Sequence, residues 1–586
     1  MIFGKYINKY YLKYSWLLLL GVAALVAVDI FQLRIPEIYG SVIDGLDPTT
    51  PATLTKELLG KLCIDMLIVI AVMVVGRFLW RVCFFGSAIR VETELRHKMF
   101  DHCKDLSQSF YQVNKVGNMM SLFTNDLETI HECFGDGVLM LVDALVLGGM
   151  SIVKMARLNL TLTLLSSIPL VFLGAVSVIV GKQMTLKWKK RQEAFSDLSD
   201  FAQESFSGIA VIKAFVKETK ELLAFEKVNK NNEEANVSFV KTAVLLRIFI
   251  TLFIQSIICI ILGVGGYLAY TGVFTSSQLI MFLSYFNSVI WPVMAISNLI
   301  ELRSRGKASL KRVSDLLDTE IDVKDVNVTN ELQSIKGKIE FRNLTFKYPT
   351  GEFNVLENVS FTINAGENIG IIGKTGSGKS TIVDLILRTY NVPDNTIFID
   401  DVDINRIPIK LLRQYCAYVP QDNFLFSDTI ANNIGFAFED KPDMSKIQKV
   451  ANLADLDENV REFKDGYDTM LGERGVTISG GQKQRASIAR ALLKDGSILI
   501  LDDSVSAVDT KTERIILDNL KDTREGKTTI LIAHRVTTIQ QMDRVLFVDN
   551  GRILAFGTHD ELYASCDAYK KMVDLQRLED EFGGVQ

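Results

Sequence analysis

Six apolar stretches, each long enough to cross a lipid bilayer as a helix, constrain the fold of this chain most. We place them near residues 16–39, 64–88, 134–155, 159–181, 245–271 and 277–300. Inside a bilayer, backbone polar groups must be hydrogen-bonded within the protein, so isolated spanning stretches form helices. The sequence therefore predicts a six-helix α-helical transmembrane domain over residues 1–318.

Basic residues predict the orientation of these stretches. The long segment between the fourth and fifth stretches carries eleven Lys and Arg from Lys182 to Lys241, whereas the short loop between the fifth and sixth carries none. Positive charge accumulates on cytoplasmic loops, so we expect the long segments in the cytosol. The basic N-terminus lacks a cleavable signal pattern and is also expected there. Lys154 and Arg157 fall in a predicted outer turn and disagree with this topology.

The two long intracellular segments are helical in pattern. In "FYQVNKVGNMMSLFTNDLETI" (110–130) and "ESFSGIAVIKAFVKE" (204–218), a glycine interrupts an amphipathic pattern. Each interruption predicts a short transverse helix between two long ones. A surface helix with a turn explains the pattern equally well.

Polar residues occur inside the apolar stretches, where charge is costly. They are Asp29, Gln32, Arg34, Arg77, Arg81 and Asp143. One interpretation is a polar substrate path, and the other is an internal Asp–Arg pair that only fixes helix packing. "WP" at 291–292 predicts a kink in the sixth stretch, either near a pathway or accommodated by packing.

The second half of the chain has the composition of a soluble domain. With 586 residues, the chain is too long for one core, and we expect a linker at 319–337 and an α/β domain at 338–586. The net charge of −5 does not suggest a nucleic-acid partner. Its seven cysteines are widely spaced, which predicts free thiols rather than disulfides or a metal site.

A phosphate-binding loop opens this domain. "IGIIGKTGSGKSTIVDLIL" (369–387) reads as a strand, a glycine-rich loop and a helix, and it fits GxxxxGK[ST] at full spacing. Backbone N–H groups of such a loop surround phosphates, the lysine reaches the β and γ phosphates, and the serine ligates Mg²⁺. The predicted nucleotide-binding residues are Gly373, Lys374, Thr375, Gly376, Ser377, Gly378, Lys379, Ser380 and Thr381.

Two further segments complete the predicted Mg·ATP chemistry. The apolar strand "SILILDD" supplies Asp502 for the metal. In "ISGGQKQRASIARAL" (478–492), Ser479, Gly480 and Gly481 precede a helix and form a second anion-binding helix N-terminus. One nucleotide does not need two such cradles from one chain, whereas two chains facing head to tail would use both. A glycine-rich cap without a ligand is the alternative.

These motifs together resemble the ATP-binding cassette (ABC) exporters, specifically half-transporters with six spans fused to one cassette. The resemblance covers nearly the whole chain. It rests on the P-loop at 373–380, the signature from Ser479 to Gln482, the Walker B strand ending at Asp502, and His534 in "TTILIAHRV". The two glycine-interrupted segments match the family's coupling regions, although Asn118 departs from the acidic residue that usually follows that glycine.

The resemblance implies further residue roles. Gln421 in "YVPQDNFLF" looks like the Q-loop glutamine that contacts the metal and the attacking water, and Tyr348 matches the aromatic that stacks on adenine. "GERG" (472–475) looks like the exporter loop before the signature, and "SAVD" (506–509) looks like the D-loop. ATP and Mg²⁺ are the implied ligands, and the implied mechanism is alternating access driven by ATP binding between two cassettes.

Asp503 departs from the family's pattern, in which a glutamate polarises the attacking water. An aspartate places its carboxylate about 1 Å or more short of that position, which can cost on the order of a hundredfold in rate. We therefore expect Asp503 and His534 to form a site that binds Mg·ATP and hydrolyses it poorly. The signature fits the consensus and would complete a partner's site. This predicts a heterodimer with a second half-transporter, and a homodimer with two slow aspartate sites is the alternative.

Other functions are possible for chains with a cassette. An ATP-gated channel or regulatory subunit would use the same domains, but nothing in the sequence resembles a regulatory insertion. Six spans exclude a soluble DNA-repair ATPase, and importers usually keep spans and cassette on separate chains. We expect export of a small amphiphile, lipid or peptide across a lipid membrane, the bacterial plasma membrane. The acidic residues Asp29 and Asp143 would suit cationic amphiphiles.

Overall fold

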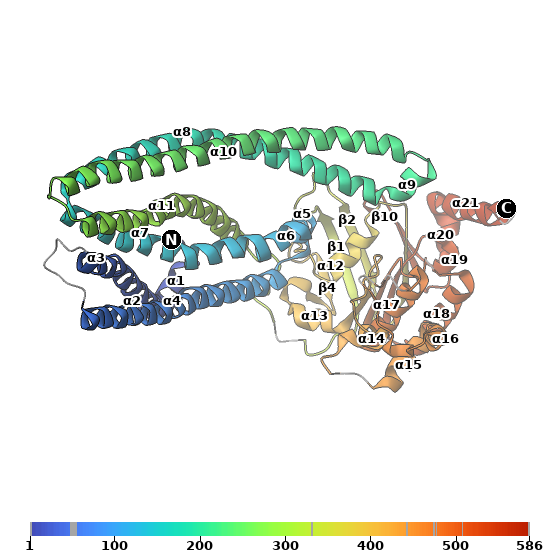
Figure 1. Cartoon of the computed structure of the whole chain (residues 1–586). Coiled ribbons are helices and arrows are strands. Elements are labelled where there is room, and N and C mark those ends of the chain that lie inside the picture. Colours follow the sequence, from blue (N-terminus) through green and yellow to red (C-terminus); the bar gives the residue numbers. More distant parts are fainter. Residues whose placement is uncertain are drawn as a thin grey trace. The chain divides into compact units, whose positions relative to one another are not determined.

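The structure is a computed structural model that describes residues 3–46, 55–329, 332–440, 443–472, 475, 478–506 and 508–583, with some side chains in 170–182 and 580–583 left out. These residues divide into two compact units. We call Met1–Phe100 with Met120–Asp318 the helical unit, and Asp101–Met119 with Thr319–Gln586 the sheet unit. Figure 1 labels their elements in chain order.

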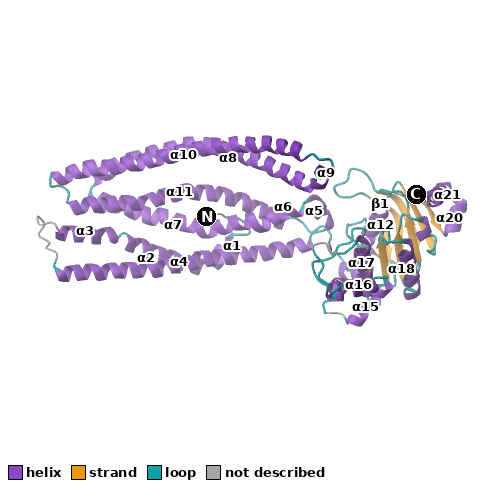
Figure 2. Ribbon diagram, turned by 45° about the vertical axis from the view of Figure 1, so that its right-hand side comes forward, coloured by secondary structure: helices purple, strands orange, loops and turns teal. Residues whose placement is uncertain are grey.

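The helical unit consists of long helices joined by short turns (Figures 1 and 2). Its elements are α1 (Asn8–Lys13), α2 (Ser15–Gln32), α3 (Ile35–Leu46), α4 (Lys56–Asp105), α6 (Val116–Ser121), the π-helical turn η1 (Leu122–Asp126), α7 (Leu127–Leu158), α8 (Leu160–Ser207), α9 (Ile209–Ala214), α10 (Glu218–Tyr270) and α11 (Ser276–Leu317). The last residues of α4 (101–105) and the first residues of α6 (116–119) are counted with the sheet unit.

Five helical stretches of the described residues are long and apolar enough to cross a membrane. They are Ser15–Leu46, Lys56–Asp105, Val116–Leu158, Glu218–Tyr270 and Ser276–Leu317. Five of the six predicted spans fall within them. The predicted span at 159–181 falls in α8, where several side chains lie outside the described residues. The count of six spans therefore stays a prediction.

The first span is broken, although the sequence pattern predicts one continuous stretch. Helix α2 ends at Gln32, and α3 begins at Ile35. Pro36 explains the break, because proline lacks the N–H that would bond to the Gln32 carbonyl and its ring crowds that carbonyl. Pro292, in contrast, lies inside α11 without ending that helix.

Lys154 forms an ion pair inside the helical unit. Its Nζ pairs with Glu37 of α3, and Tyr285 of α11 donates a hydrogen bond of 3.4 Å to the same carboxylate. These contacts join α7, α3 and α11, and the orientation of the spans stays a prediction.

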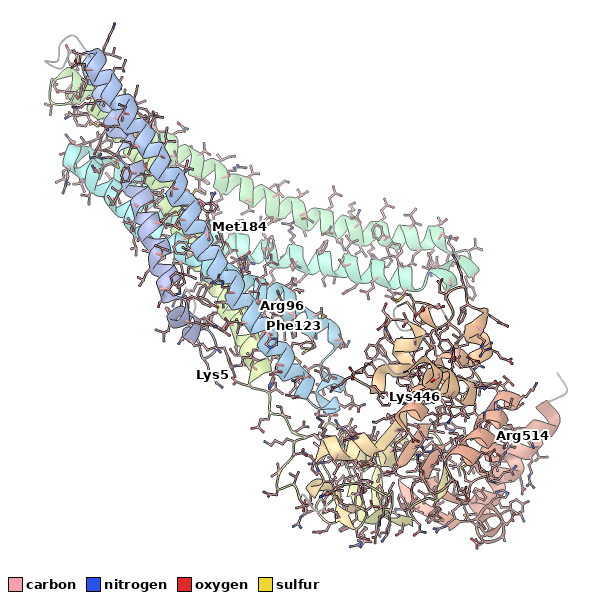
Figure 3. The ribbon with its side chains drawn as sticks, turned by 90° about the horizontal axis from the view of Figure 1, so that it is seen from below. Lys5, Arg96, Phe123, Met184, Lys446 and Arg514 are labelled. Carbon is pink, nitrogen blue, oxygen red and sulfur yellow. The ribbon has the colours of Figure 1, made fainter. Side chains whose placement is uncertain are left out.

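Antiparallel pairs of long helices build this unit. Helix α8 packs along α10, and α7 packs along α11. Side chains project outward along α8 and α10, among them that of Met184 (Figure 3). Short helices interrupt both long segments, but the two glycines differ. The six-residue helix α9 begins directly after Gly208, as predicted, whereas α5 (Gln108–Val113) ends before Gly117, which lies inside α6. Gly208 separates α8 from α9.

The sheet unit contains two sheets covered by helices (Figure 2). Its strands are β1 (Ile339–Phe346), β2 (Leu356–Ile363), β3 (Asn368–Ile372), β4 (Ile397–Ile399), β5 (Val402–Asp403), β6 (Cys416–Val419), β7 (Ile498–Asp502), β8 (Thr528–Ile532), β9 (Arg544–Asp549) and β10 (Arg552–Gly557). Its helices include α12 (Lys379–Ile386), α13 (Ile409–Tyr415), α14 (Ile430–Ile434), α15 (Met444–Leu453), α16 (Asp457–Glu462), α17 (Gly480–Lys494), α18 (Thr510–Thr523), α19 (Val536–Ile539), α20 (His559–Ser565) and α21 (Asp567–Gly583).

The larger sheet brings the predicted motifs to one edge. Its strand order is β10-β9-β3-β8-β7-β6, and the pairs β9/β3, β3/β8, β8/β7 and β7/β6 are parallel. Parallel strands end at the same edge of a sheet. The P-loop follows β3, Asp502 ends β7, Gln421 follows β6 and His534 follows β8. The smaller antiparallel sheet has the order β2-β1-β4-β5.

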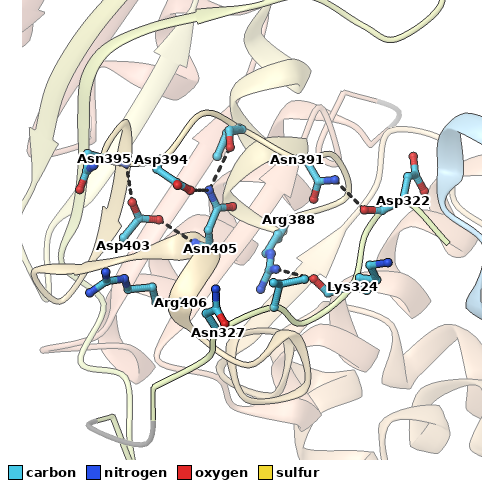
Figure 4. A pocket seen from close by; sticks show the side chains of 12 residues that line it. Asp322, Lys324, Asn327, Arg388, Asn391, Asp394, Asn395, Asp403, Asn405 and Arg406 are labelled. Atoms are coloured by element: carbon cyan, nitrogen blue, oxygen red, sulfur yellow. Dashed lines mark hydrogen bonds between the residues drawn. The ribbon is translucent and has the colours of Figure 1, made fainter. Parts of the chain in front are cut away.

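A buried arginine ties the segment after α11 to the sheet unit (Figure 4). Arg388 is 2% exposed, and its guanidinium donates to the carboxylate of Asp325 at 3.1 Å and to the carbonyl of Lys324 at 2.9 Å. Asn391 donates to the carbonyl of Asp322, whose side chain accepts a hydrogen bond of 3.2 Å from Ser109. The short intracellular segment 101–119 and the chain after residue 319 thus share contacts within this unit.

Candidate nucleotide site

The loop between β3 and α12 has the backbone that phosphate binding requires. Gly376 and Gly378 have φ angles of +81° and +99°, which side chains other than glycine rarely adopt. Gly378 is the N-cap of α12, so the positive end of this helix opens toward the loop. The Ser377 hydroxyl is buried and has no hydrogen-bond partner among the described residues. A phosphate oxygen would accept that free donor.

Gly373 packs too closely against β9 for any side chain. A Cβ atom at this position would lie 1.9 Å from the carbonyl oxygen of Val548, which is backbone and cannot move aside cheaply. We expect Gly373→Ala to lower the free energy of unfolding by about 1–3 kcal/mol and to weaken ATP binding. Thermal unfolding with and without Mg·ATP measures both effects. Gly86→Ala in α4 is the control, because its Cβ would meet no atom within 4 Å. Equal stability of both variants would contradict the prediction.

Lys379 is held inside the loop. It is 7% exposed, and its Nζ donates to the carbonyls of Gly373 and Lys374, both at 2.9 Å. Burial lowers the pKa of this ammonium from its usual range, while the nearby carboxylates of Asp502 and Asp503 act in the opposite direction. The ammonium therefore lies at the loop, beside the two aspartates that end the Walker B strand.

Ser380 and Asp502 form the pair that fits a magnesium ion. Ser380 Oγ donates to Asp502 Oδ1 at 3.1 Å, so a hydroxyl and a carboxylate from two separate motifs meet. Asp502 is 3% exposed, and burial raises the pKa of its carboxyl group, while the Ser380 hydrogen bond lowers it. Mg²⁺ prefers hard oxygen ligands and binds proteins through one or two carboxylates plus substrate phosphates. These two residues fit that donor set.

Gln421 is not brought to this pair. It is exposed on the loop after β6, and its carbonyl accepts a hydrogen bond of 3.4 Å from Asn423. In the described ranges, its side chain makes no hydrogen bond to Ser380 or Asp502. A loop glutamine is free to move toward a ligand, so its metal and catalytic role stays a prediction.

Asp503 sits in an unusual backbone conformation. Its φ angle is +47°, its N–H donates to the carbonyl of Ile532 at 3.0 Å, and its own carbonyl accepts from Gln484 at 3.2 Å. Aspartate tolerates this left-handed region better than glutamate. Its Oδ1 is buried without a hydrogen-bond partner in the described part of the chain, and its Oδ2 lies 3.9 Å from His534 Nε2. The predicted base and the predicted histidine are therefore neighbours.

Tyr348 lies beside the P-loop helix. Its hydroxyl is 2.9 Å from Thr381 Oγ1, and its ring packs edge-on against Tyr390 at 5.0 Å between centroids. Burial raises the pKa of its phenol. The hydrogen bond fixes the ring next to the predicted phosphate site, which suits the predicted role in holding the base of a nucleotide.

The predicted signature caps a different helix. Ser479 is the N-cap of α17, where its Oγ accepts from the Gln482 N–H at 3.2 Å and the Gln482 side chain accepts from the Ser479 N–H at 3.0 Å. A Cβ at Gly480 would meet no atom within 4 Å, and Gly481 is half-buried. Among the described residues, no hydrogen bond joins this cap to the P-loop. The exporter loop at 472–475 and the D-loop at 506–509 fall partly outside the described residues.

Sequence reasoning did not identify two side chains next to this site. Gln484 of α17 is 3% exposed and holds the Asp503 carbonyl. Asp384 of α12 is close enough to Asp502 for their charges to interact. The signal for Asp384 was an acidic residue within the otherwise apolar run "TIVDLIL".

Asp384 makes the stability of the sheet unit depend on pH. Burial, and then the charge of Asp502, raises the pKa of its carboxyl group from 3.8 to about 6. The folded chain therefore holds this proton more tightly than the unfolded chain, so stability is lost as pH rises from about 4 through about 6. Above that range we expect Asp384→Asn to stabilise the fold by about 1–3 kcal/mol.

Melting temperatures at pH 5 and pH 8 check the Asp384 prediction. The difference in melting temperature between the parent and Asp384→Asn should be larger at pH 8 than at pH 5. The control is Asp522→Asn, at an exposed position of α18. If the parent instead gained stability relative to Asp384→Asn between pH 5 and pH 8, the change would have the opposite sign to the one expected. That result would contradict a raised pKa of Asp384 in the folded chain.

Comparisons with known proteins agree with this geometry. The family model described as ABC transporter transmembrane region matches residues 18–293, and the model described as ABC transporter matches residues 356–506. The chain is 36% identical over 576 residues to the Bacillus subtilis protein named probable multidrug resistance ABC transporter ATP-binding/permease protein YheI, covering 98% of this chain and 97% of the relative.

Other relatives cover similar lengths. The chain is 34% identical to the Escherichia coli multidrug resistance-like ATP-binding protein MdlA, over 97% of this chain and 96% of that protein. It is 33% identical to the ATP-dependent lipid A-core flippase of Pseudoalteromonas translucida, over 87% and 88%. A solved bacterial Atm1-family ABC exporter with ATP bound shares the fold, with a TM-score of 0.75 at 24% identity over 97% of this chain and 98% of that one.

The two family models together match most of the chain, in the order in which the helical and sheet units occur. Relatives above 30% identity extend over nearly its full length. The chain therefore belongs to the ABC transporter family, as an ATPase and translocase that carries its transmembrane region and its ATP-binding domain on one polypeptide.

Proposed function

We propose that this chain is one subunit of a heterodimeric ABC exporter that moves small amphiphilic substrates across a membrane by alternating access. The proposal rests on the separation, within this chain, of the P-loop residues from the signature. Lys379, Ser380 and Asp502 lie together in the sheet unit, whereas no hydrogen bond among the described residues joins the signature cap at Ser479 to them, and a Cβ at Gly480 would meet no atom within 4 Å. A second chain facing this one head to tail would supply the missing cradle.

Each group in the site would then have a task. The P-loop amides, the Ser377 hydroxyl and the Lys379 ammonium would bind the phosphates, and Tyr348 would hold the adenine. Ser380 and Asp502 would hold Mg²⁺, with Gln421 joining when its loop closes. The metal ion, when bound, neutralises charge that develops on the transferred phosphoryl group. Asp503 would orient the attacking water, with His534 beside it.

Asp503 is the basis for proposing two different subunits. Its carboxylate is tethered by one methylene fewer than that of a glutamate, and its φ of +47° fixes where the side chain leaves the backbone. An error of about 1 Å in such a group can cost on the order of a hundredfold in rate. We infer a site that binds Mg·ATP and turns over slowly, while the signature of this chain completes a faster site on the partner.

The helical unit would supply the pathway. We propose that α8 supplies a sixth span in addition to the five helical stretches that are long and apolar enough to cross a membrane. The N-terminus and the ATP-binding domain would lie in the cytosol of a bacterium. ATP-driven closure of two cassettes would shift the helical unit through α5, α9 and the segment after α11. Because the relatives are named for multidrug resistance and for a lipid flippase, small amphiphiles or lipids are the proposed substrates.

Transport in inside-out vesicles tests the exporter proposal. Vesicles that contain the complex should accumulate a lipophilic fluorescent reporter when Mg·ATP is added outside, and the reporter should leave when ATP is exhausted. Vesicles with a Lys379→Met variant of this chain are the matched control and should accumulate much less. ATP-dependent ion current without reporter accumulation would instead indicate a channel and overturn the proposal.

A further inference from the structure

Two buried aspartates lie on neighbouring helices of the helical unit. Asp29 of α2 is 2% exposed and Asp143 of α7 is 8% exposed. Helix α2 packs on α7. Both belong to stretches that are long and apolar enough to cross a membrane. Two like charges in such a place are costly unless a proton or a cation joins them.

The arginines in the same stretches do not neutralise this pair. Arg77 donates to Gln32 at 3.4 Å, and the guanidinium of Arg81 lies 5.3 Å from the ring of Trp80. Asp29 Oδ2 and Asp143 Oδ1 are buried and have no hydrogen-bond partner among the described residues. The alternative of a packing pair between aspartate and arginine is therefore not what the structure shows. Two buried acceptor atoms of this pair therefore lack a donor among the described residues.

An aromatic side chain completes the cluster. Trp291 of α11 donates from Nε1 to Asp143 Oδ2 at 2.8 Å, and the residue is 43% exposed. The next residue, Pro292, packs so tightly on α7 that a Cβ at Gly148 would lie 2.9 Å from the proline Cβ. This contact holds the indole beside the carboxylates while part of it stays accessible. An indole face attracts organic cations.

The neighbouring surface is apolar. Leu33 and Leu147 each follow one of the aspartates by four residues, so they extend along the same helix faces. Both are buried in a cluster that also contains Phe282, Phe286 and Val289. A ligand held here would therefore meet negative charge at one end and hydrocarbon beside it. Among the described residues no group of three or more His, Cys, Asp or Glu could hold a metal ion.

We propose that Asp29, Asp143 and Trp291 bind the cationic group of an amphiphilic organic monocation. The carboxylates supply the charge, the indole supplies an aromatic face, and the adjoining leucines contact the hydrocarbon. The inference rests on the proposed exporter function, since it names the class of substrate that the helical unit would carry. It makes the pair a recognition site and not a packing feature.

Equilibrium binding of tetraphenylphosphonium tests this site. The complex is purified through this chain, placed in lipid nanodiscs and titrated without ATP. Asp29→Asn and Asp143→Asn should each weaken binding at least about tenfold, since each removes a charge partner in a site of low dielectric. Asp65→Asn, at an exposed position of α4, is the matched control and should bind like the parent. Triphenylphosphine oxide, a neutral probe of similar shape, should bind all variants alike.

Conservative variants still test the inference if an asparagine variant misfolds. Asp143→Glu keeps the charge and should retain binding within about threefold, whereas Trp291→Leu should weaken it several-fold. Cation binding that is equal in parent, Asp29→Asn and Asp143→Asn would overturn the inference and would indicate that the pair holds only a proton. The outcome is independent of the exporter proposal, because binding needs no ATP. Export of a neutral reporter with cation binding unaffected by these aspartates would contradict the inference alone.

Discussion

Replacing Lys379 with methionine is expected to weaken Mg·ATP binding to this chain's own P-loop about tenfold to hundredfold. The ammonium is 7% exposed and is held by the Gly373 and Lys374 carbonyls, so it is positioned before a nucleotide arrives. Methionine has a similar length but no charge and no donor. Titration of the purified chain with a fluorescent ATP analogue measures the loss, and vesicle transport should fall with it.

The control for Lys379→Met is Lys446→Met. Lys446 is exposed on α15 of the same unit, so its removal changes the charge by the same amount without touching the loop (Figure 3). We expect this control to bind ATP like the parent. Equal ATP affinity for parent and Lys379→Met, with both proteins folded, would mean that the loop does not bind the nucleotide in the predicted way.

Asp503→Glu is expected to accelerate hydrolysis at this chain's P-loop by about tenfold to hundredfold within the two-subunit complex. The added methylene moves the carboxylate outward to where it can contact the attacking water. His534 is already 3.9 Å from the shorter side chain, so the site contains its neighbour. The φ of +47° opposes the change, and the variant should lose about 1 kcal/mol of stability.

ATP turnover at this chain's P-loop must be measured separately from turnover at the partner's P-loop. A complex whose partner lacks its own P-loop lysine reports turnover at this chain's P-loop alone. Asp522→Glu, which lengthens an exposed carboxylate on α18, is the control and should leave the rate unchanged. The purified chain without a partner should gain little from Asp503→Glu, because the signature that closes its site comes from another subunit. A large gain in the isolated chain would be inconsistent with an obligate partner.

Local sequence patterns predict much of this molecule. The P-loop spacing places Gly373, Gly378 and Lys379 correctly, because a strand, a tight turn and a helix form from neighbouring residues. Ser380 and Asp502 pair because the P-loop after β3 and the end of β7 lie at the same edge of one sheet, with β8 between the two strands. The apolar stretches predict helices of spanning length, and the interruption predicted at Gly208 is where α8 ends and α9 begins, whereas Gly117 lies inside α6 and does not mark the end of α5.

Contacts between residues far apart in the sequence could not be predicted in this way. Nothing local shows that Lys154 pairs with Glu37, or that Arg388 holds the carbonyl of Lys324. The same holds for Asp29 and Asp143, for which the sequence left open either a polar substrate path or a packing pair with an arginine. Such contacts depend on how helices pack, and one sequence contains no direct record of that packing. The backbone of Asp503 is a further case, because its positive φ arises from strand β8 and helix α17 around it.

The subunit composition of the complex, purified from its native membrane through a tag on this chain, tests the central claim most directly. The account predicts a second, distinct ABC half-transporter in equal amount. That partner would contain the glutamate that Asp503 replaces and would face the intact signature at Ser479. Two copies of this chain and nothing else would contradict the account, because Asp503 would then have to serve as the working base in both sites.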